Sequence, residues 1–325
     1  MNDFRNLIKP KIVVEPPGPR VREIFELGGL RSYEYAQPIL EDAQGIFIKD
    51  PDGNIFVDFI SGRCVTNIGY SHPKLVKALQ TQASKGIHGL TEHRLRLSEK
   101  ISEITPGDFS KRVYYGQSGS AMNDLGIKAA RWATKRPYIV AFAGAYHGVT
   151  YGALSISSYR PYMIKGFYPN LPGIYHMPYP YCYRCPFKKE YPECDLACLW
   201  YIEDYAFKSF LPPEEVAAVI FEPVAGDAGW HVPPDDWLPT LKKICDNHGI
   251  LLIAEEVQTG FGRTGKWFAV EHWGVVPDML LLGKAISCGV PNAASVLKEE
   301  LCTQKHTGEV LQTGHTFGGS PLGCV

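Results

Sequence analysis

Residues 249–291 decide the fold, and they read GILLIAEEVQTGFGRTGKWFAVEHWGVVPDMLLLGKAISCGVP. Two short apolar runs, residues 250–254 and 279–282, are flanked by chain breakers and are too short for helices, so each predicts a buried strand. The residues between them predict a loop and then a helix around 267–273. A strand, a crossover and a second strand together predict a parallel pair with a right-handed connection.

Charged side chains follow both of these strands. The first run ends in Glu255 and Glu256, and the second is followed by Gly283 and Lys284. Open α/β sheets build their sites at the carboxyl ends of the strands. A buried ammonium group is costly, so a lysine at this place is neutralised, paired or used covalently. Lys284 therefore either forms a Schiff base or extends its amine to water at the sheet edge, and these residues alone leave both open.

The composition is that of a soluble globular protein. The chain has 325 residues, of which 45% are hydrophobic and 21% are charged, and this length allows a large core in one or two domains. A formal net charge of −1 gives no indication of nucleic acid or of an anionic membrane as a partner. The sequence contains no run of eighteen apolar residues, so we expect no transmembrane helix. The first residues lack the apolar core of a signal peptide. We expect a cytoplasmic protein.

Four of the nine cysteines are clustered with the spacing C-x2-C-x8-C-x3-C, and they are Cys182, Cys185, Cys194 and Cys198. In a reducing cytosol such a cluster indicates a metal site before a disulfide pair. The outer spacings suit zinc, although the intervening loop is short. A structural metal or Fe–S site, two disulfides and free thiols all remain open.

The rest of the chain alternates between predicted strands and helices. Residues 1–20 are proline-rich and predict an extended arm, and 45–49 and 54–60 predict a hairpin around the turn 50–53. Further strands are predicted at 112–115, 138–142 and 216–222, and helices at 21–27, 73–83, 94–104, 121–133 and 237–247. This alternation is typical of an α/β protein with a mostly parallel sheet and helices on both faces.

Residues 159–198 interrupt this alternation. They contain seven prolines, many tyrosines and the cysteine cluster, and such a long irregular segment is more often functional or interfacial than part of a core. The last residues, 317–325, look like the beginning of a helix without a cap, so we expect the sequence to be a fragment.

Three other strand ends carry residues suited to chemistry. The turn 116–120 joins a strand to a helix and is rich in glycine and serine, which suits the binding of an anion such as phosphate. Tyr146 and His147 follow the next strand, and Glu222 and Asp227 follow the third. Each of these features alone is as compatible with an ordinary turn, core or rim residue. Together with Glu255 and Lys284 they suit pyridoxal phosphate (PLP), whose ring nitrogen needs an acid and whose carbonyl needs a lysine.

Over residues 30–325 the chain resembles the class III aminotransferases of PLP fold type I, the group of 4-aminobutyrate, ornithine and acetylornithine aminotransferases. The four-cysteine insertion resembles that of archaeal members. The motifs that carry the resemblance are Asp58-Phe-Ile-Ser-Gly62, Gly69-Tyr-Ser-His-Pro73, Glu255-Glu-Val-Gln-Thr-Gly-Phe-Gly-Arg-Thr-Gly265, Leu282-Gly-Lys284 and Thr316-Phe-Gly-Gly-Ser-Pro321.

The resemblance implies a role for each matching residue. Lys284 would be the Schiff-base lysine, Tyr146 would stack on the ring, and Val257 would pack on its other face. Gln258 would bond the phenolic oxygen, and Thr316 would reach the phosphate of the neighbouring subunit in a homodimer. The residues expected at the cofactor are Ser118, Gly119, Ser120, Tyr146, His147, Glu222, Glu255, Val257, Gln258, Lys284 and Thr316.

The sequence departs from the family at several places. Glu255 stands where the family has aspartate against the pyridine nitrogen, and Asp227 stands where 4-aminobutyrate and ornithine enzymes have a glutamate. Arg63 occupies a position near the substrate that is usually apolar, and either contacts a substrate carboxylate or lies at the rim. The domain division implied is an arm and part of a small domain at 1–65, a large PLP-binding domain at 66–325, and a C-terminal small domain that is absent.

Three functions follow as hypotheses. The first is transamination between an amino acid or ω-amino acid and a 2-oxo acid such as 2-oxoglutarate, with Lys284 and Glu255 as catalytic residues. The second is an amino-acid racemase on the same scaffold, which the departure at Asp227 keeps open. The third is a truncated PLP-binding chain without turnover.

Overall fold

The structure is a computed structural model, and it describes residues 9–27, 38–167, 170–304 and 307–325. The first eight residues of the expected arm, and 168–169 of the expected insertion, lie outside these ranges. By compactness the chain divides into an N-terminal unit, residues 1–85 with Val325, and a larger unit, residues 86–324. This boundary follows Lys85, and the division at residue 65 that the resemblance implies stays a prediction. None of the described helices has the length and apolar character needed to cross a bilayer.

The N-terminal unit contains a small antiparallel sheet in the order β1-β2-β3. The hairpin turn is as predicted, because Asp50 Oδ1 accepts from the main-chain N–H of Asp52 and Asn54, and Gly53 has a φ of 86° that favours glycine. The expected arm does not stand free, since Lys11 bridges Ile55 of β3. The elements of this unit are α1 (Pro19–Leu27), β1 (Asp42–Gln44), β2 (Phe47–Lys49), β3 (Ile55–Val57), α2 (Ser61–Cys64) and α3 (Pro73–Ala83).

The larger unit is built on a seven-stranded sheet in the order β4-β10-β9-β8-β7-β5-β6. From β9 to β6 all neighbours are parallel, whereas β10 is antiparallel to both β4 and β9. The predicted α/β class with a mostly parallel sheet is therefore confirmed. The strands are β4 (Lys111–Gly116), β5 (Tyr138–Phe142), β6 (Ile174–Met177), β7 (Val216–Phe221), β8 (Leu251–Glu255), β9 (Met279–Leu282) and β10 (Ala293–Lys298).

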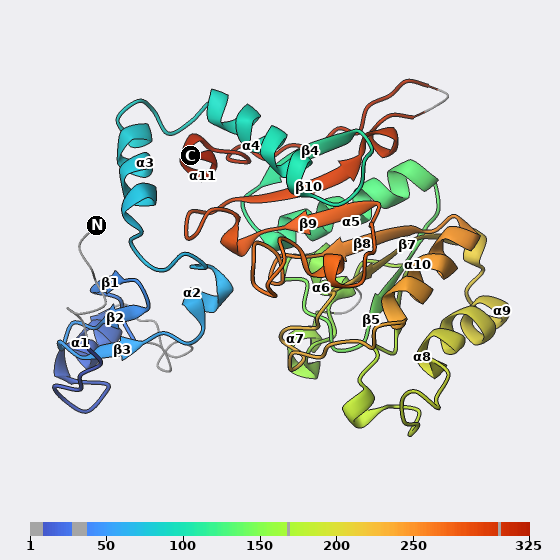
Figure 1. Cartoon of the computed structure of the whole chain (residues 1–325), viewed down its shortest axis with the longest axis horizontal. Coiled ribbons are helices and arrows are strands. Elements are labelled where there is room, and N and C mark those ends of the chain that lie inside the picture. The colour runs from blue at the N-terminus through green and yellow to red at the C-terminus, as the bar shows by residue number, and fades with distance from the viewer. Residues whose placement is uncertain (1–8, 28–37, 168–169, 305–306) are drawn as a thin grey trace. The chain divides into compact units, whose positions relative to one another are not determined.

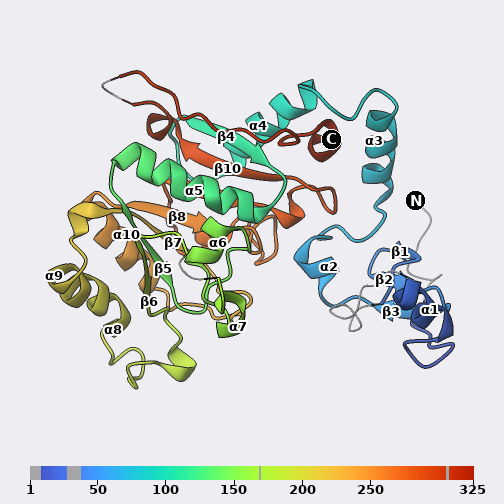
Figure 2. The ribbon, with the colours of Figure 1, turned by 180° about the vertical axis from the view of Figure 1, so that it is seen from behind.

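Helices cover both faces of this sheet (Figures 1 and 2). Alternate strand residues face opposite sides: Val219 and Leu252 share a core with α10, and Ile220 and Ile253 share a second core with α5. The helices are α4 (Glu92–Ile104), α5 (Gly119–Thr134), α6 (Tyr151–Ile156), α7 (Pro161–Ile164), α8 (Ala197–Trp200), α9 (Phe207–Ser209), α10 (Trp237–His248) and α11 (Pro321–Cys324). The shorter turns are η2 (Cys182–Arg184), η3 (Tyr201–Ala206, a π-helix), η4 (Pro213–Glu215), η5 (Ala269–His272), η6 (Lys284–Ile286) and η7 (Glu299–Cys302).

The stretch 249–291 forms the parallel pair β8 and β9 at the middle of the sheet, as predicted. The helix expected around 267–273 is only the 3₁₀ turn η5. The segment 159–198 is less irregular than predicted, because β6 lies within it and pairs with β5 at the sheet edge.

Candidate active site

Glu255 is the last residue of β8 and is 4% exposed. Its Oε1 accepts from the main-chain N–H of Val257 at 2.8 Å, and its Oε2 lies 3.2 Å from Nδ1 of His147. The carboxylate is thus held by the start of its own loop and by a residue of the loop after β5. It lies in the middle of the carboxyl-end edge of the sheet, where the sequence predicted a site.

His147 is held from both sides of its main chain. Its N–H donates to Ser157 Oγ at 2.9 Å, and its carbonyl accepts from Asn123 Nδ2 at 2.7 Å. The imidazole is fully buried, and its Nε2 has no hydrogen-bond partner. A ring held this firmly can orient the carboxylate of Glu255, and the free Nε2 indicates that a further polar group belongs beside it.

Glu222 is the neighbour of Glu255 across the sheet, because the preceding residues Phe221 and Ala254 are paired in the register of β7 and β8. Its Oε2 is buried without a partner. Burial, and then the negative charges of Glu255 and Asp227, raise the pKa of the Glu222 carboxyl well above its usual range. Burial beside a second carboxyl therefore favours the neutral form of Glu222.

Glu256, the second acid after the strand, has a structural role instead. It is fully buried and accepts hydrogen bonds from the hydroxyl of Thr259 and from the N–H groups of Ala269 and Val270, the last two at 2.9 Å each. Burial raises the pKa of its carboxyl to about 7. Glu256 therefore fixes the loop after β8 to η5 and does not face the site of Glu255.

Lys284 begins the turn η6, and only Gly283 separates it from the end of β9. Its φ of 46° lies in the left-handed region, where a residue other than glycine is strained and often functional. The side chain is half-buried, and Nζ donates a hydrogen bond to Oε1 of Gln258. Lys284 is thus not simply extended to water, and it lies close enough to Glu222 for its positive charge to lower the pKa of that carboxyl.

The turn between β4 and α5 forms a helix N-terminus open to an anion. Ser118 caps the sixteen-residue helix by accepting from the N–H of Ala121 at 3.2 Å, and the first turn contains no acidic residue. The positive end of the helix and its free N–H groups favour a phosphate. Next to this turn, Val257 lies so close to Gly119 and Gly283 that an added Cβ would be 2.8 Å and 3.0 Å from its Cγ1.

These residues fit PLP. The donor set combines a helix N-terminus for a phosphate, an amine at Lys284 for a carbonyl and a buried acid at Glu255 for a ring nitrogen. Two buried polar atoms have no hydrogen-bond partner: Nε2 of His147, in the loop after β5, and Oε2 of Glu222, directly after β7. Gly119 packs closely against Val257, so only a residue without a side chain fits at this place in the turn.

The structure does not bring all predicted residues together. Tyr146 is half-buried with its ring edge-to-face against Tyr159 at 5.9 Å. Asp227 is exposed in the loop after β7, although it lies close enough to Glu222 for its charge to raise the pKa of that carboxyl. Thr316 is also exposed, with its carbonyl 3.1 Å from Nε2 of His88. Arg63 belongs to the N-terminal unit, where its φ is 65°. The roles expected for these four residues stay predictions.

Sequence reasoning missed the residues that support the site. Asn123 bridges the carbonyls of Gly119 and His147, and its position on the buried face of α5 is a signal that could have been used. Ser157 and Tyr179 gave no such signal. The hydroxyl of Tyr179 donates to the carbonyl of Glu222 at 3.1 Å and so fixes the end of β7.

The four clustered cysteines line one small cavity, and each has a free thiol. Across the residues that the structure describes, no three His, Cys, Asp or Glu side chains are arranged to hold a metal ion as they stand. The metal site predicted from the spacing is therefore not formed in this arrangement of the thiols.

The comparison with protein families agrees with this site. The family model for class-III aminotransferases matches residues 31–325, which is most of the chain. The chain belongs to the class-III aminotransferases. Members of this family use PLP, and a solved structure similar to this one, the taurine:2-oxoglutarate aminotransferase of Bifidobacterium kashiwanohense, is described with PLP and glutamate. That structure has a TM-score of 0.84 and 30% identity, and the match covers 94% of this chain and 70% of the other.

Curated relatives of this class-III aminotransferase chain include racemases as well as transaminases. The alanine/serine racemase of Pyrococcus horikoshii is 41% identical over 90% of the chain, and the leucine/methionine racemase of Thermococcus litoralis is 41% identical over 82%. A probable 4-aminobutyrate aminotransferase of Bacillus subtilis is 36% identical over 87% of the chain and 65% of its own length. The chain spans 64% and 61% of the length of the two racemases. An ω-transaminase of Thermomicrobium roseum has a TM-score of 0.85 at 28% identity, with 94% of this chain and 72% of the other covered.

Proposed function

We propose that the chain forms the catalytic part of a PLP-dependent aminotransferase, which transfers the amino group of an amino acid to a 2-oxo acid such as 2-oxoglutarate. The observation that carries the proposal is the placement of Lys284 and Glu255 just past β9 and at the end of β8, two adjacent parallel strands. When bound, PLP supplies an electron sink that stabilises a negative charge at the substrate Cα.

The residues of the chain have distinct roles in this proposal. Lys284 would hold the cofactor in the resting enzyme and, once released, its Nζ would move a proton to and from Cα. Glu255 would keep the ring nitrogen protonated, and the hydrogen bonds of His147 and the Val257 N–H would hold the carboxylate in place for this. Ser118, Gly119 and Ser120 would bind the phosphate at the N-terminus of α5.

The remaining contacts of the site are proposed from the resemblance. Val257, which packs against Gly119 and Gly283, would lie on one face of the ring, and Tyr146 on the other. Gln258 would form a hydrogen bond with the phenolic oxygen. Its side-chain amide lies beside the amine of Lys284, because Oε1 of Gln258 accepts a hydrogen bond from Nζ. Arg63 and Asp227 would contact the substrate.

We further propose a homodimer that works in the cytoplasm. Thr316, exposed at the turn before α11, would reach the phosphate in the neighbouring subunit. Nine cysteines without a disulfide suit a reducing compartment. Size-exclusion chromatography with light scattering tests the dimer, and a monomer at micromolar concentration with full activity would contradict it.

Racemisation is the second candidate, and two observations favour it. The two relatives at 41% identity are racemases. Racemisation by two bases needs a proton donor on each face of Cα, and Asp227 lies in the loop whose Gly226 approaches Gln258, the partner of Lys284. Lys284 and Asp227 would be the two groups.

One experiment separates the two candidates. The full reading frame is expressed, loaded with PLP and incubated with single L-amino acids, with and without 2-oxoglutarate. For an aminotransferase we expect glutamate to form only when the 2-oxo acid is present, with no D-amino acid. A D-enantiomer that appears at a catalytic rate without any 2-oxo acid would replace this proposal with the racemase. No turnover of either kind, in protein that binds PLP, would overturn both.

A further inference from the structure

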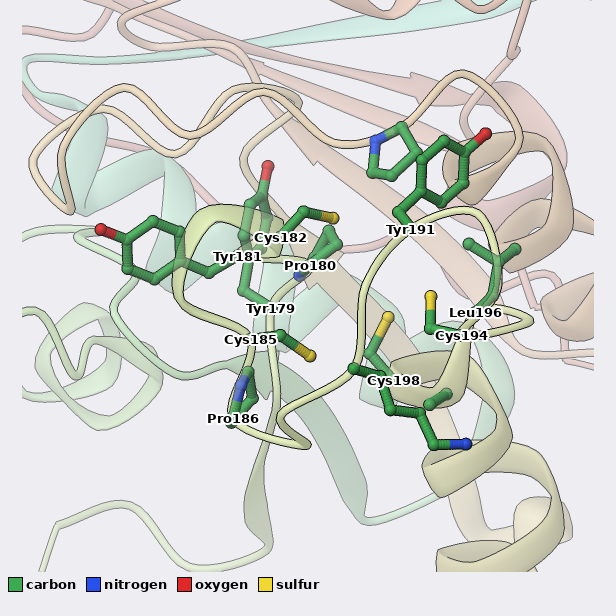
Figure 3. Close-up of a pocket in the computed structure, with 13 residues that line it drawn as sticks. Tyr179, Pro180, Tyr181, Cys182, Cys185, Pro186, Tyr191, Cys194, Leu196 and Cys198 are labelled. Carbon is green, nitrogen blue, oxygen red and sulfur yellow. The ribbon is translucent and has the colours of Figure 1, made fainter.

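The four thiols of Cys182, Cys185, Cys194 and Cys198 surround a single cavity of about 20 Å³. A space of this size holds about one water molecule or one ion. Figure 3 shows that Cys182 and Cys185 come from one side of this space, and Cys194 and Cys198 from the other. Two segments of the chain thus approach each other with two sulfurs each.

The four cysteines line one space and not two. Cys182 interacts electrostatically with Cys185 and Cys194, and also with Cys198. Two structural disulfides would need each sulfur to face one partner only. One centre shared by four thiols is instead the arrangement that a tetrahedral metal ion uses.

The surroundings suit a negatively charged metal–thiolate group. Lys189 lines the same cavity, and its positive charge would offset the net charge of a divalent ion with four thiolates. The indole of Trp237 is buried and lies beside Cys198. Metal-bound thiolates use N–H donors such as an indole for supporting hydrogen bonds.

The backbone of the second segment also needs support. Lys188, Asp195 and Leu196 all have φ values near 50°, in the left-handed region that residues other than glycine rarely occupy. Strained residues persist only where the surrounding structure fixes them. A metal ion that joins this segment to Cys182 and Cys185 would supply that restraint.

We propose that Cys182, Cys185, Cys194 and Cys198 bind one structural Zn²⁺ ion. Four S–Zn bonds form and four protons leave to solvent, so the sulfurs move toward a common centre from the wider arrangement that the structure shows. Zinc fits because it prefers four thiolates in tetrahedral geometry and needs no oxidant or reductant.

The ion would support the candidate active site from outside. The segment before Cys182 carries Tyr179, whose hydroxyl bonds the carbonyl of Glu222, and Tyr181, whose ring stacks on His231 at 3.7 Å. Zinc at the cysteines would therefore hold the wall next to the end of β7. We expect loss of the ion to loosen this wall without removing a group that contacts PLP.

Metal analysis of the purified protein is the direct test. Inductively coupled plasma mass spectrometry is expected to find about one zinc per chain, and a zinc-binding dye to report its release when a mercurial blocks the thiols. Cys182→Ser and Cys194→Ser should each lose the zinc, whereas Cys64→Ser, at a half-buried cysteine of the N-terminal unit, should keep it. Chelation should lower the Tm of the wild type but not of the two cluster variants.

A second measurement needs no variant. Co²⁺ added to the metal-free wild type should give the intense visible bands of tetrahedral thiolate coordination. Iron with acid-labile sulfide would overturn the proposal, as would two disulfides with only the other five thiols reactive in denaturant. Metal-free protein with nine reactive thiols and no cobalt spectrum would overturn it as well.

Discussion

Nδ1 of His147 lies 3.2 Å from Oε2 of Glu255, and both side chains are buried at the carboxyl edge of the sheet. The other carboxylate oxygen is bound by the N–H of Val257. Both ends of the longer acid are thus restrained. Under the proposed function, these two contacts would hold the longer acid in place for the ring nitrogen of PLP.

Glu255→Gln should lower kcat by about 10²–10⁴-fold, because an amide cannot keep the ring nitrogen protonated. Glu255→Asp, which restores the acid of the family, should keep kcat within about tenfold and serves as the matched control. Steady-state kinetics with saturating PLP test both variants. Equal activity of Glu255→Gln and the wild type would show that Glu255 does not serve the ring.

Gly119→Ala should weaken the binding of PLP about tenfold or more, since its Cβ would lie 2.8 Å from Val257. The double variant Gly119→Ala with Val257→Ala removes the methyl groups of the clash and should recover part of the affinity. Fluorescence titration of the cofactor-free protein with PLP measures both. If the double variant binds no better than Gly119→Ala alone, the close packing with Val257 is not the cause.

Glu222→Gln should change how stability depends on pH. The pKa of Glu222 is raised in the folded protein, so the folded state binds the proton more tightly than the unfolded state. The wild type therefore loses stability as the pH rises from the pKa of Glu222 in the unfolded chain toward its pKa in the folded protein. Glu222→Gln has no such loss, because the amide does not titrate. The Tm of the variant relative to the wild type should increase between pH 5 and pH 8.

The control for that prediction is Glu214→Gln, which removes a carboxylate at an exposed position of η4. Its Tm relative to the wild type should stay level over the same pH range. A level difference for Glu222→Gln as well would mean that Glu222 is not held in its neutral form.

The sequence predicted the strands best where apolar runs are bounded by breakers. The runs that became β5 and β9 have the bounds expected, since both are fully internal and have no competing pattern. It missed β10, whose antiparallel pairing to β4 and β9 is a long-range choice that local pattern does not encode. It also missed β6, because prolines and tyrosines around it masked a short edge strand.

The candidate site was predictable in its residue types but not in its contacts. The positions of Glu255 and Lys284 follow from the strand ends. The strand-end pattern does not separate Glu255 from Glu256. The family resemblance selects Glu255, and the packing of η5 shows that Glu256 is structural. The approach of His147 to Glu255 joins loops 108 residues apart, so it depends on the order of the strands in the sheet.

The proposed function depends most on covalent binding of PLP by Lys284. The holoenzyme is reduced with borohydride, digested and analysed by mass spectrometry, with Lys284→Ala and the exposed control Lys266→Ala treated in the same way. We predict a phosphopyridoxyl group on the peptide with Lys284 in the wild type and in Lys266→Ala, and none in Lys284→Ala, whose kcat falls at least about 10²-fold. A modified peptide that lacks Lys284, or a wild type without any adduct, would contradict the account.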